Sequence, residues 1–140
     1  MGNFKKSWEM EVGINNVPAY QVSGRPFCSG GINCSPGTGP QVVEFPYVSR
    51  WISVINNDIS NSVKVGFSEA GVNGTNFFTV PNLGGAPGLL AHTHVLEVKA
   101  SQIWISGSSN VDVVAGLTSI LPDRTNTSDG PSWSGSSGVG

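Results

Sequence analysis

The stretch SVKVGFS, residues 62–68, decides the fold class that the sequence predicts. Large apolar residues occupy every second position of this stretch, and serine, lysine and glycine fill the other positions. Successive side chains of a β-strand point to opposite faces, so this alternation indicates a strand with one buried and one solvated face. The expected buried face carries Val63, Val65 and Phe67, and the expected solvated face carries Ser62, Lys64 and Ser68.

Similar short segments recur along the whole chain, separated by glycine, proline and asparagine. The stretch 29–40 is rich in glycine and proline and is interpreted as turns, and residues 69–76 are expected to form a loop. No segment keeps a helical period over three turns. Further strands are expected at 8–14, 19–23, 41–45, 47–56, 77–80, 94–100, 102–106 and 111–117.

This spacing of short strands predicts an all-β fold, an antiparallel β-sandwich of jelly-roll-like form. A lipocalin-like barrel is less favoured, because strands of about five to seven residues are short for enclosing a ligand. With 140 residues the chain suits a single domain. We expect an N-terminal arm or edge strand at 1–16, the sandwich at 17–121 and a Gly/Ser-rich C-terminal arm at 122–140.

The composition excludes several classes of protein. Only 11% of residues are charged and the net charge is -2, which gives no basic footprint for nucleic acid. No stretch approaches the roughly 20 apolar residues that span a bilayer, and no signal peptide is expected. We therefore expect neither nucleic acid nor a membrane among its partners. Soluble monomers usually carry more charge, so the surface is either polar but neutral or largely covered by other proteins.

His92 and His94 flank Thr93 and form the sharpest local motif. On a strand the two imidazoles would point to one face and could hold a transition metal, with three such pairs around a threefold axis. This spacing resembles the His-x-His metal sites of trimeric phage tail fibres. The alternative is two histidines at a loop edge, exposed or hydrogen-bonded, and no cofactor is otherwise expected.

The two cysteines, Cys28 and Cys34, flank a short glycine-containing loop. They could form a disulfide, but two cysteines in a chain without a signal are more often free thiols. A zinc site built from both cysteines together with His92 and His94 has the right number of ligands, but its spacing matches no zinc module.

No enzyme signature is present, and we expect the protein not to be an enzyme. Residues 66–70 fail the nucleophile-elbow pattern, because Ala70 stands where the second glycine is needed. The carboxylates are scattered along the chain, and nothing selects a catalytic pair among them. Most are expected to be solvated or to pair across strands with Lys64 and Lys99.

The aromatic residues suggest where a partner would bind. Trp51 and Trp104 lie in apolar strands and are expected to pack in the core or on a sheet face. Near the chain ends, an aromatic side chain is an effective anchor, because it buries much area for little loss of entropy. The candidate partner-binding residues are therefore Phe4, Trp8 and Trp133, although both terminal tryptophans could instead fold back on their own domain, and exposed aromatics could stack on sugars.

The segments PAYQVSGRPF (18–27), PYVSRWISVIN (46–56), VKVGFSEAGVNGTNFFTV (63–80) and EVKASQIWISGSSNVDVVAGLTSI (97–120) carry a resemblance. Together they resemble small virion structural proteins of tailed phages, particularly podovirus-like and cyanophage-like viruses. The resemblance implies head decoration or cement proteins, or components of tail fibres and baseplates, which often use jelly-roll domains and trimerise. It rests on a strand pattern and short phrases, so it transfers no functional residue.

The expectation from the sequence is therefore a noncatalytic virion structural protein, assembled in the host cytoplasm. It would decorate or cement a phage capsid by binding between subunits of the major capsid protein, as a homo-oligomer with a trimer favoured. Two alternatives remain open. One is a tail-fibre or baseplate adaptor with a metal at His92 and His94, and the other is a host-glycan-binding β-sandwich module.

Overall fold

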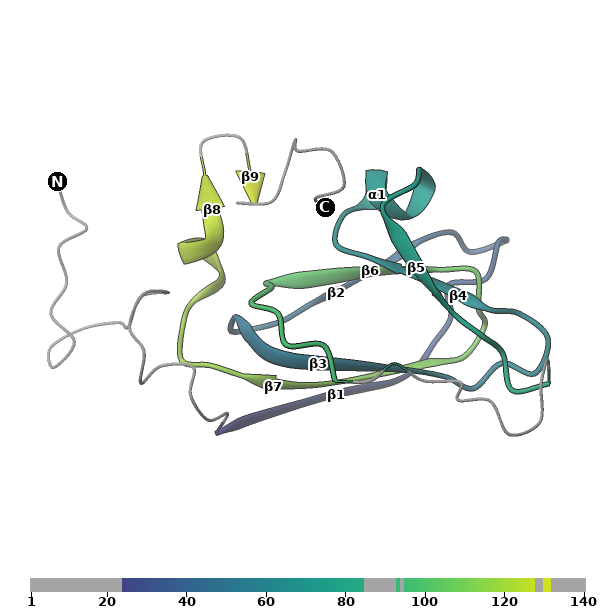
Figure 1. Cartoon of the computed structure of the whole chain (residues 1–140), viewed down its shortest axis with the longest axis horizontal. Coiled ribbons are helices and arrows are strands. Elements are labelled where there is room, and N and C mark those ends of the chain that lie inside the picture. The colour runs from purple at the N-terminus through teal and green to yellow at the C-terminus, as the bar shows by residue number, and fades with distance from the viewer. Residues whose placement is uncertain (1–23, 85–92, 94, 128–129, 132–140) are drawn as a thin grey trace, which may run out of the picture.

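Two antiparallel sheets dominate the computed structural model, which describes residues 24–84, 93, 95–127 and 130–131 (Figure 1). The all-β fold class predicted from the sequence is confirmed. In Figure 1 the four-stranded sheet lies above the three-stranded sheet. Within the described residues, no helix has the length and apolar character needed to cross a membrane.

The three-stranded sheet has the order β1-β7-β3. Its strands are β1 (Arg25–Ile32), β7 (Val111–Leu117) and β3 (Ser49–Asn56). The central strand β7 is antiparallel to both neighbours. Its inward side chains are small and branched, which suits a strand packed on one face.

The four-stranded sheet has the order β2-β6-β4-β5. Its strands are β2 (Gln41–Glu44), β6 (Gln102–Ser106), β4 (Val63–Gly66) and β5 (Phe77–Val80). The short helix α1 (Glu69–Asn73) connects β4 to β5. After β7 follow the 3-10 helix η2 (Pro122–Thr125) and a two-stranded sheet of β8 (Asn126–Thr127) and β9 (Gly130–Pro131), within the segment that was predicted to be an arm.

A single hydrophobic cluster joins the two sheets. Both sheets alternate buried and less buried residues along their strands, so each turns one apolar face inward. Burying a valine or isoleucine side chain contributes about 1.5–3 kcal/mol, which makes this cluster the main source of stability. Its fully buried members include Ile52 and Val54 of β3, Val63 and Val65 of β4, Ile103 and Ile105 of β6, and Val111 and Val113 of β7.

The alternation over residues 62–68 is confirmed in its buried half, since Val63 and Val65 are buried and Phe67 packs against the core. The strand ends at Gly66, however, because Ser68 begins helix α1. The Ser68 Oγ accepts a hydrogen bond of 2.9 Å from the Gly71 N–H, which is a typical N-cap. The prediction of a plain loop over 69–76 is therefore wrong in its first half.

Strand β1 corrects the prediction that residues 29–40 form only turns. Pairing with β7 extends the strand to Ile32, with a register shift between Ser29 and Ile32. Gly31 takes a positive φ of 66°, and its N–H donates to the Asp112 Oδ1 at 2.8 Å. The glycines that suggested a turn instead allow a bulge inside a strand. The expected strands at 8–14 and 19–23 lie outside the described residues.

The prediction of a strand over 94–100 is only partly right. The described residues of this segment run beside β3, but they form one isolated bridge instead of a ladder. Neighbouring contacts are displaced by one residue, so no continuous register exists. The main-chain bonds are Thr93 N to Val54 O at 2.9 Å, Leu96 N to Ile52 O at 2.8 Å, Ile52 N to Leu96 O at 2.9 Å, and Ser49 N to Ala100 O at 2.9 Å.

Hydroxyl side chains supply the bonds that the missing ladder would have made. The Thr93 Oγ1 accepts from the Val54 N–H at 2.9 Å. The Ser49 Oγ accepts from the Ala100 N–H at 3.0 Å and donates to the Val98 carbonyl at 2.7 Å. Because main-chain groups next to a core need partners, these hydroxyls let an irregular segment cover β3.

The fully buried Asn56 fastens one end of the fold. Its Nδ2 donates to the carbonyls of Asn61 at 2.9 Å and Pro81 at 3.2 Å. Its Oδ1 accepts from the Asp58 N–H at 3.1 Å and from the Ser108 Oγ at 2.8 Å. One carboxamide therefore connects the end of β3, the following turn, the end of β5 and the β6–β7 connection.

Asp58, a residue that is only 8% exposed, extends this connection with its carboxylate. Oδ1 accepts from the N–H groups of Ser60 at 2.8 Å and Asn61 at 3.1 Å. Oδ2 accepts from the N–H of Ser109 at 2.9 Å and from its Oγ at 2.7 Å. The hydrogen bonds from Ser109 and Ser60 hold the pKa of Asp58 well below its usual range.

Replacing Asn56 with alanine is expected to lower the free energy of unfolding by about 2–4 kcal/mol, because buried donors and acceptors on several segments lose their partner. Urea denaturation measures this change. The matched control is Asn110→Ala, which removes an exposed carboxamide and should change the free energy by less than about 0.5 kcal/mol. Equal effects of the two variants would contradict the role given to Asn56.

Asp58 is expected to make the stability depend on pH in the acid range. Because its pKa is lower in the folded state, its contribution is present above the unfolded pKa of about 4 and is lost as the pH falls toward the folded pKa. The free energy of unfolding should fall more steeply between about pH 5 and about pH 2 in the wild type than in Asp58→Asn. The exposed Glu44→Gln is the control that should keep the steep fall; parallel curves for wild type and Asp58→Asn would refute this role.

Candidate functional site

The candidate site residues named from the sequence lie outside the described residues. This holds for the partner-binding candidates Phe4, Trp8 and Trp133 and for the metal candidates His92 and His94. Their roles therefore stay predictions. Thr93, between the two histidines, is described, and its main chain and hydroxyl both bond to Val54 of β3.

Both cysteines are free thiols. Cys28 is exposed on β1, whereas Cys34 is buried and its main chain bonds to Gly107 and Ser108 at 2.7 and 2.8 Å. Burial raises the pKa of the Cys34 thiol, so this group stays protonated near neutral pH. Across the described ranges, no three His, Cys, Asp or Glu side chains gather closely enough to hold a metal.

Several described carboxylates bond to main-chain N–H groups or to arginine, as Asp58 and Glu97 do. Glu97 accepts from Arg50 at 2.9 Å, and because Glu97 is exposed this pair adds little stability. Asp112 accepts from the Gly31 N–H and from Asn57. Lys64 instead lies over the ring of Phe77, with its Nζ 4.7 Å from the ring centroid.

Trp51 and Trp104 lie half-buried on outward sheet faces. Of the two predicted placements, core or sheet face, the structure has the sheet face. Trp104 on β6 is opposite Val42 of β2 on one side and Gly66 of β4 on the other. Gly66 is in turn opposite Phe77 of β5. An apolar row therefore crosses the outer face of the four-stranded sheet and ends at a pocket.

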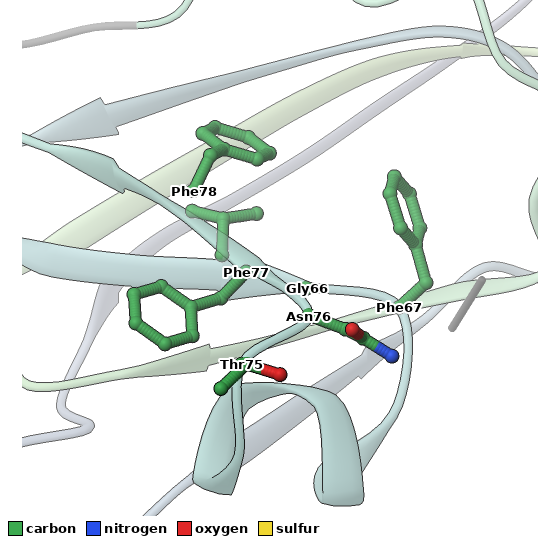
Figure 2. A pocket seen from close by; sticks show the side chains of 7 residues that line it. Gly66, Phe67, Thr75, Asn76, Phe77 and Phe78 are labelled. Atoms are coloured by element: carbon green, nitrogen blue, oxygen red, sulfur yellow. The ribbon is translucent and has the colours of Figure 1, made fainter. Parts of the chain in front are cut away.

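This pocket has a volume of about 310 Å³ and is open to solvent on one side. Figure 2 shows that its lining residues come from the end of β4, from the segment that follows helix α1 and from the start of β5. Three of its lining residues are phenylalanines, and each of them is half-buried. The lining residues are Val65, Gly66, Phe67, Thr75, Asn76, Phe77 and Phe78.

Gly66 allows the segments that line the pocket to pack closely against one another. A Cβ atom at this position would lie 2.9 Å from the Asn76 carbonyl oxygen and 2.9 Å from the Val72 Cγ1. Both distances are below van der Waals contact, so only glycine lets α1 and the start of β5 approach β4 this closely. The adjacent Phe77 and Phe78 then point to opposite faces of β5, as the pleat requires.

Thr75 and Asn76 give the pocket its polar edge. The side chains of both residues make no hydrogen bond to any group of the described ranges, although the Asn76 N–H donates to the Gly71 carbonyl at 3.1 Å. None of the residues that line the pocket is ionisable. The arrangement offers one hydroxyl, one carboxamide and aromatic rings, which is chemistry for binding a neutral molecule.

No local sequence pattern indicates this pocket. Phe77 and Phe78 were placed in a strand, but the approach of Thr75 and Asn76 to Gly66 depends on helix α1, which was not predicted. A signal was present in Ser68 followed by Glu69, an N-cap residue with an acidic residue in the first turn. A five-residue helix is too short to show a hydrophobic period.

The outer edge of β1 is a second candidate surface. β1 is eight residues long and lies at the end of the three-stranded sheet. Among the described residues, its only strand partner is β7. Its one charged residue, Arg25, lies over the ring of Tyr47 at 4.2 Å, so the middle of the strand is uncharged.

No protein-family model, curated protein or solved structure matches the chain.

The variant Gly66→Ala is expected to lower the free energy of unfolding by about 1–3 kcal/mol, because the new methyl group presses on main-chain and buried atoms. Chemical denaturation tests this. Gly37→Ala is the matched control, since a Cβ there meets nothing within 4 Å, and it should change stability by less than about 1 kcal/mol. If both variants are equally stable, the close approach at Gly66 is not a constraint.

Proposed function

We propose that this chain is a noncatalytic virion structural protein that decorates or cements a phage capsid. In this proposal it binds between subunits of the major capsid protein, forms a homo-oligomer with a trimer favoured, and resides in the virion. Neither nucleic acid nor a membrane takes part. The proposal rests on the resemblance of its sequence phrases, on the order of its strands and on the edge of β1.

The strand order supports a jelly-roll sandwich as the finer form of the fold. One sheet has the order β2-β6-β4-β5, and the other has the order β1-β7-β3. The segment from Thr93 to Ala100 bonds along the free side of β3 and takes the place of a fourth strand there. Eight segments in two such layers correspond to a jelly roll, an architecture of viral capsid and lectin domains.

A fold alone does not define a function, so the proposal needs a surface. The observation that carries it is the edge of β1, where eight consecutive residues have one strand partner among the described residues. Monomeric proteins usually protect such edges with charged side chains along the strand. Here Phe27, Cys28 and Ser29 occupy the middle of the strand, and none of them is charged.

The proposed mechanism is strand addition by an extended segment of a capsid subunit. Main-chain hydrogen bonds along β1 would supply affinity, and side chains on alternate positions would supply specificity. Burial of a few hundred Å² at about 25 cal/mol per Å² yields several kcal/mol before the cost of ordering. Repetition of the contact over a shell multiplies this gain through avidity.

The test uses particles purified from the virus that encodes the chain. Mass spectrometry is expected to find the chain among the particle proteins, and its absence would overturn the proposal. Particles that lack the chain are then incubated with purified wild type or with Cys28→Lys, and binding is measured by co-sedimentation. The lysine places a charge at an exposed position of β1 and should weaken binding at least about tenfold.

The control for this experiment is Asn73→Lys, which adds the same charge to an exposed position at the end of helix α1. It should bind particles like the wild type. Circular dichroism confirms that both variants are folded. Equal binding by Cys28→Lys and wild type would show that β1 is not the attachment edge.

A further inference from the structure

We infer that the pocket where the end of β4 meets the start of β5, beside α1, binds a neutral saccharide. This inference goes beyond attachment to a capsid and does not depend on it. The pocket belongs to the four-stranded sheet, whereas β1 belongs to the other sheet, and Figure 1 places α1 and β1 on opposite sides of the molecule. A ligand and a capsid subunit could therefore be bound together.

The phenylalanine residues that line the pocket favour a ligand with an apolar face. Phe67, Phe77 and Phe78 all line the pocket and are half-buried. Phe67 and Phe78 also pack against the core, whereas Phe77 lies on the outer face of β5. Partly exposed apolar rings at a surface commonly mark a binding site. The ring faces of aromatic residues pack against flat apolar surfaces. One face of a pyranose ring presents several C–H groups, and a phenylalanine ring can pack against it.

The polar residues at the edge of the pocket favour a ligand with hydroxyl groups. Thr75 supplies a hydroxyl and Asn76 supplies a carboxamide, and together they offer donors and acceptors that no group of the described ranges uses. A sugar combines a C–H face with hydroxyl groups at its edge, which is the complement of this arrangement.

Charge and shape narrow the class of ligand. No ionisable side chain lines the pocket, and the nearby Lys64 ammonium lies over the ring of Phe77. An anionic ligand would therefore lack a direct ionic partner among the lining residues. The volume of about 310 Å³ is at the lower end for ligand pockets and suits one or two sugar rings. Its open side lets a polar ligand keep some hydroxyls in water, which a wholly apolar ligand would not need.

The test is an NMR titration of the full-length, ¹⁵N-labelled chain. The neutral probes are methyl α-glucoside, methyl β-galactoside and N-acetylglucosamine, the anionic probe is N-acetylneuraminic acid, and the apolar probe is indole. At least one neutral sugar is expected to shift the amide resonances of Gly66, Asn76 and Phe77, with a Kd on the order of 1 mM. Phe77→Ala and Asn76→Ala should each weaken this binding at least about tenfold.

Two controls separate loss of binding from loss of folding. Phe77→Trp keeps an aromatic face and should retain the sugar-induced shifts, and Val42→Ala changes an exposed residue of the same sheet outside the pocket. The inference is overturned if no neutral sugar shifts these resonances, or if only indole or N-acetylneuraminic acid does. It is also overturned if the shifts persist unchanged in both alanine variants. None of these outcomes bears on capsid attachment, which is measured separately by co-sedimentation.

Discussion

The buried carboxamide of Asn56 is the interaction on which the arrangement of this fold depends. The hydrophobic cluster favours packing of the two sheets, but hydrophobic burial is not directional and does not set which segments meet. Asn56 bonds to Asn61, Pro81, Asp58 and Ser108, which belong to different connections between strands. Because this carboxamide is buried, its hydrogen bonds can be made only to these neighbouring segments. They therefore hold one end of both sheets in place.

These hydrogen bonds give a second reason why the chain has so few charged residues. Many of the asparagine, serine and threonine side chains act inside the structure, where they complete main-chain hydrogen bonds that strands leave open. Ser49 and Thr93 replace ladder bonds beside β3, and the buried Thr118 Oγ1 donates to the Val48 carbonyl at 2.8 Å. Neutral hydroxyls and amides can do this in a buried position at a lower desolvation cost than ions. The composition thus reflects internal bonding as well as an uncharged surface.

The sequence predicted the parts of the fold that depend on local alternation. Val63 and Val65 both face the core, because residues two apart in a strand lie on the same face of the sheet. Strand β1 was missed in part because Gly30 and Gly31 have turn propensity, and only pairing with β7 overrides it. The pocket was missed because it arises where Gly66, α1 and Asn76 meet in space, and no local pattern records such a meeting. The terminal aromatics and the two histidines stay predictions, since they lie outside the described residues.

Two surfaces on separate sheets then support two separate proposals, a protein edge at β1 and a ligand pocket beside α1. The first of these proposals is that an extended segment of another protein pairs with the edge of β1. A high-resolution cryo-EM reconstruction of the virus particle tests this most directly. We expect an extended segment of the major capsid protein beside β1, at the strand spacing of about 4.8 Å. A β1 edge that faces solvent in the particle would contradict it.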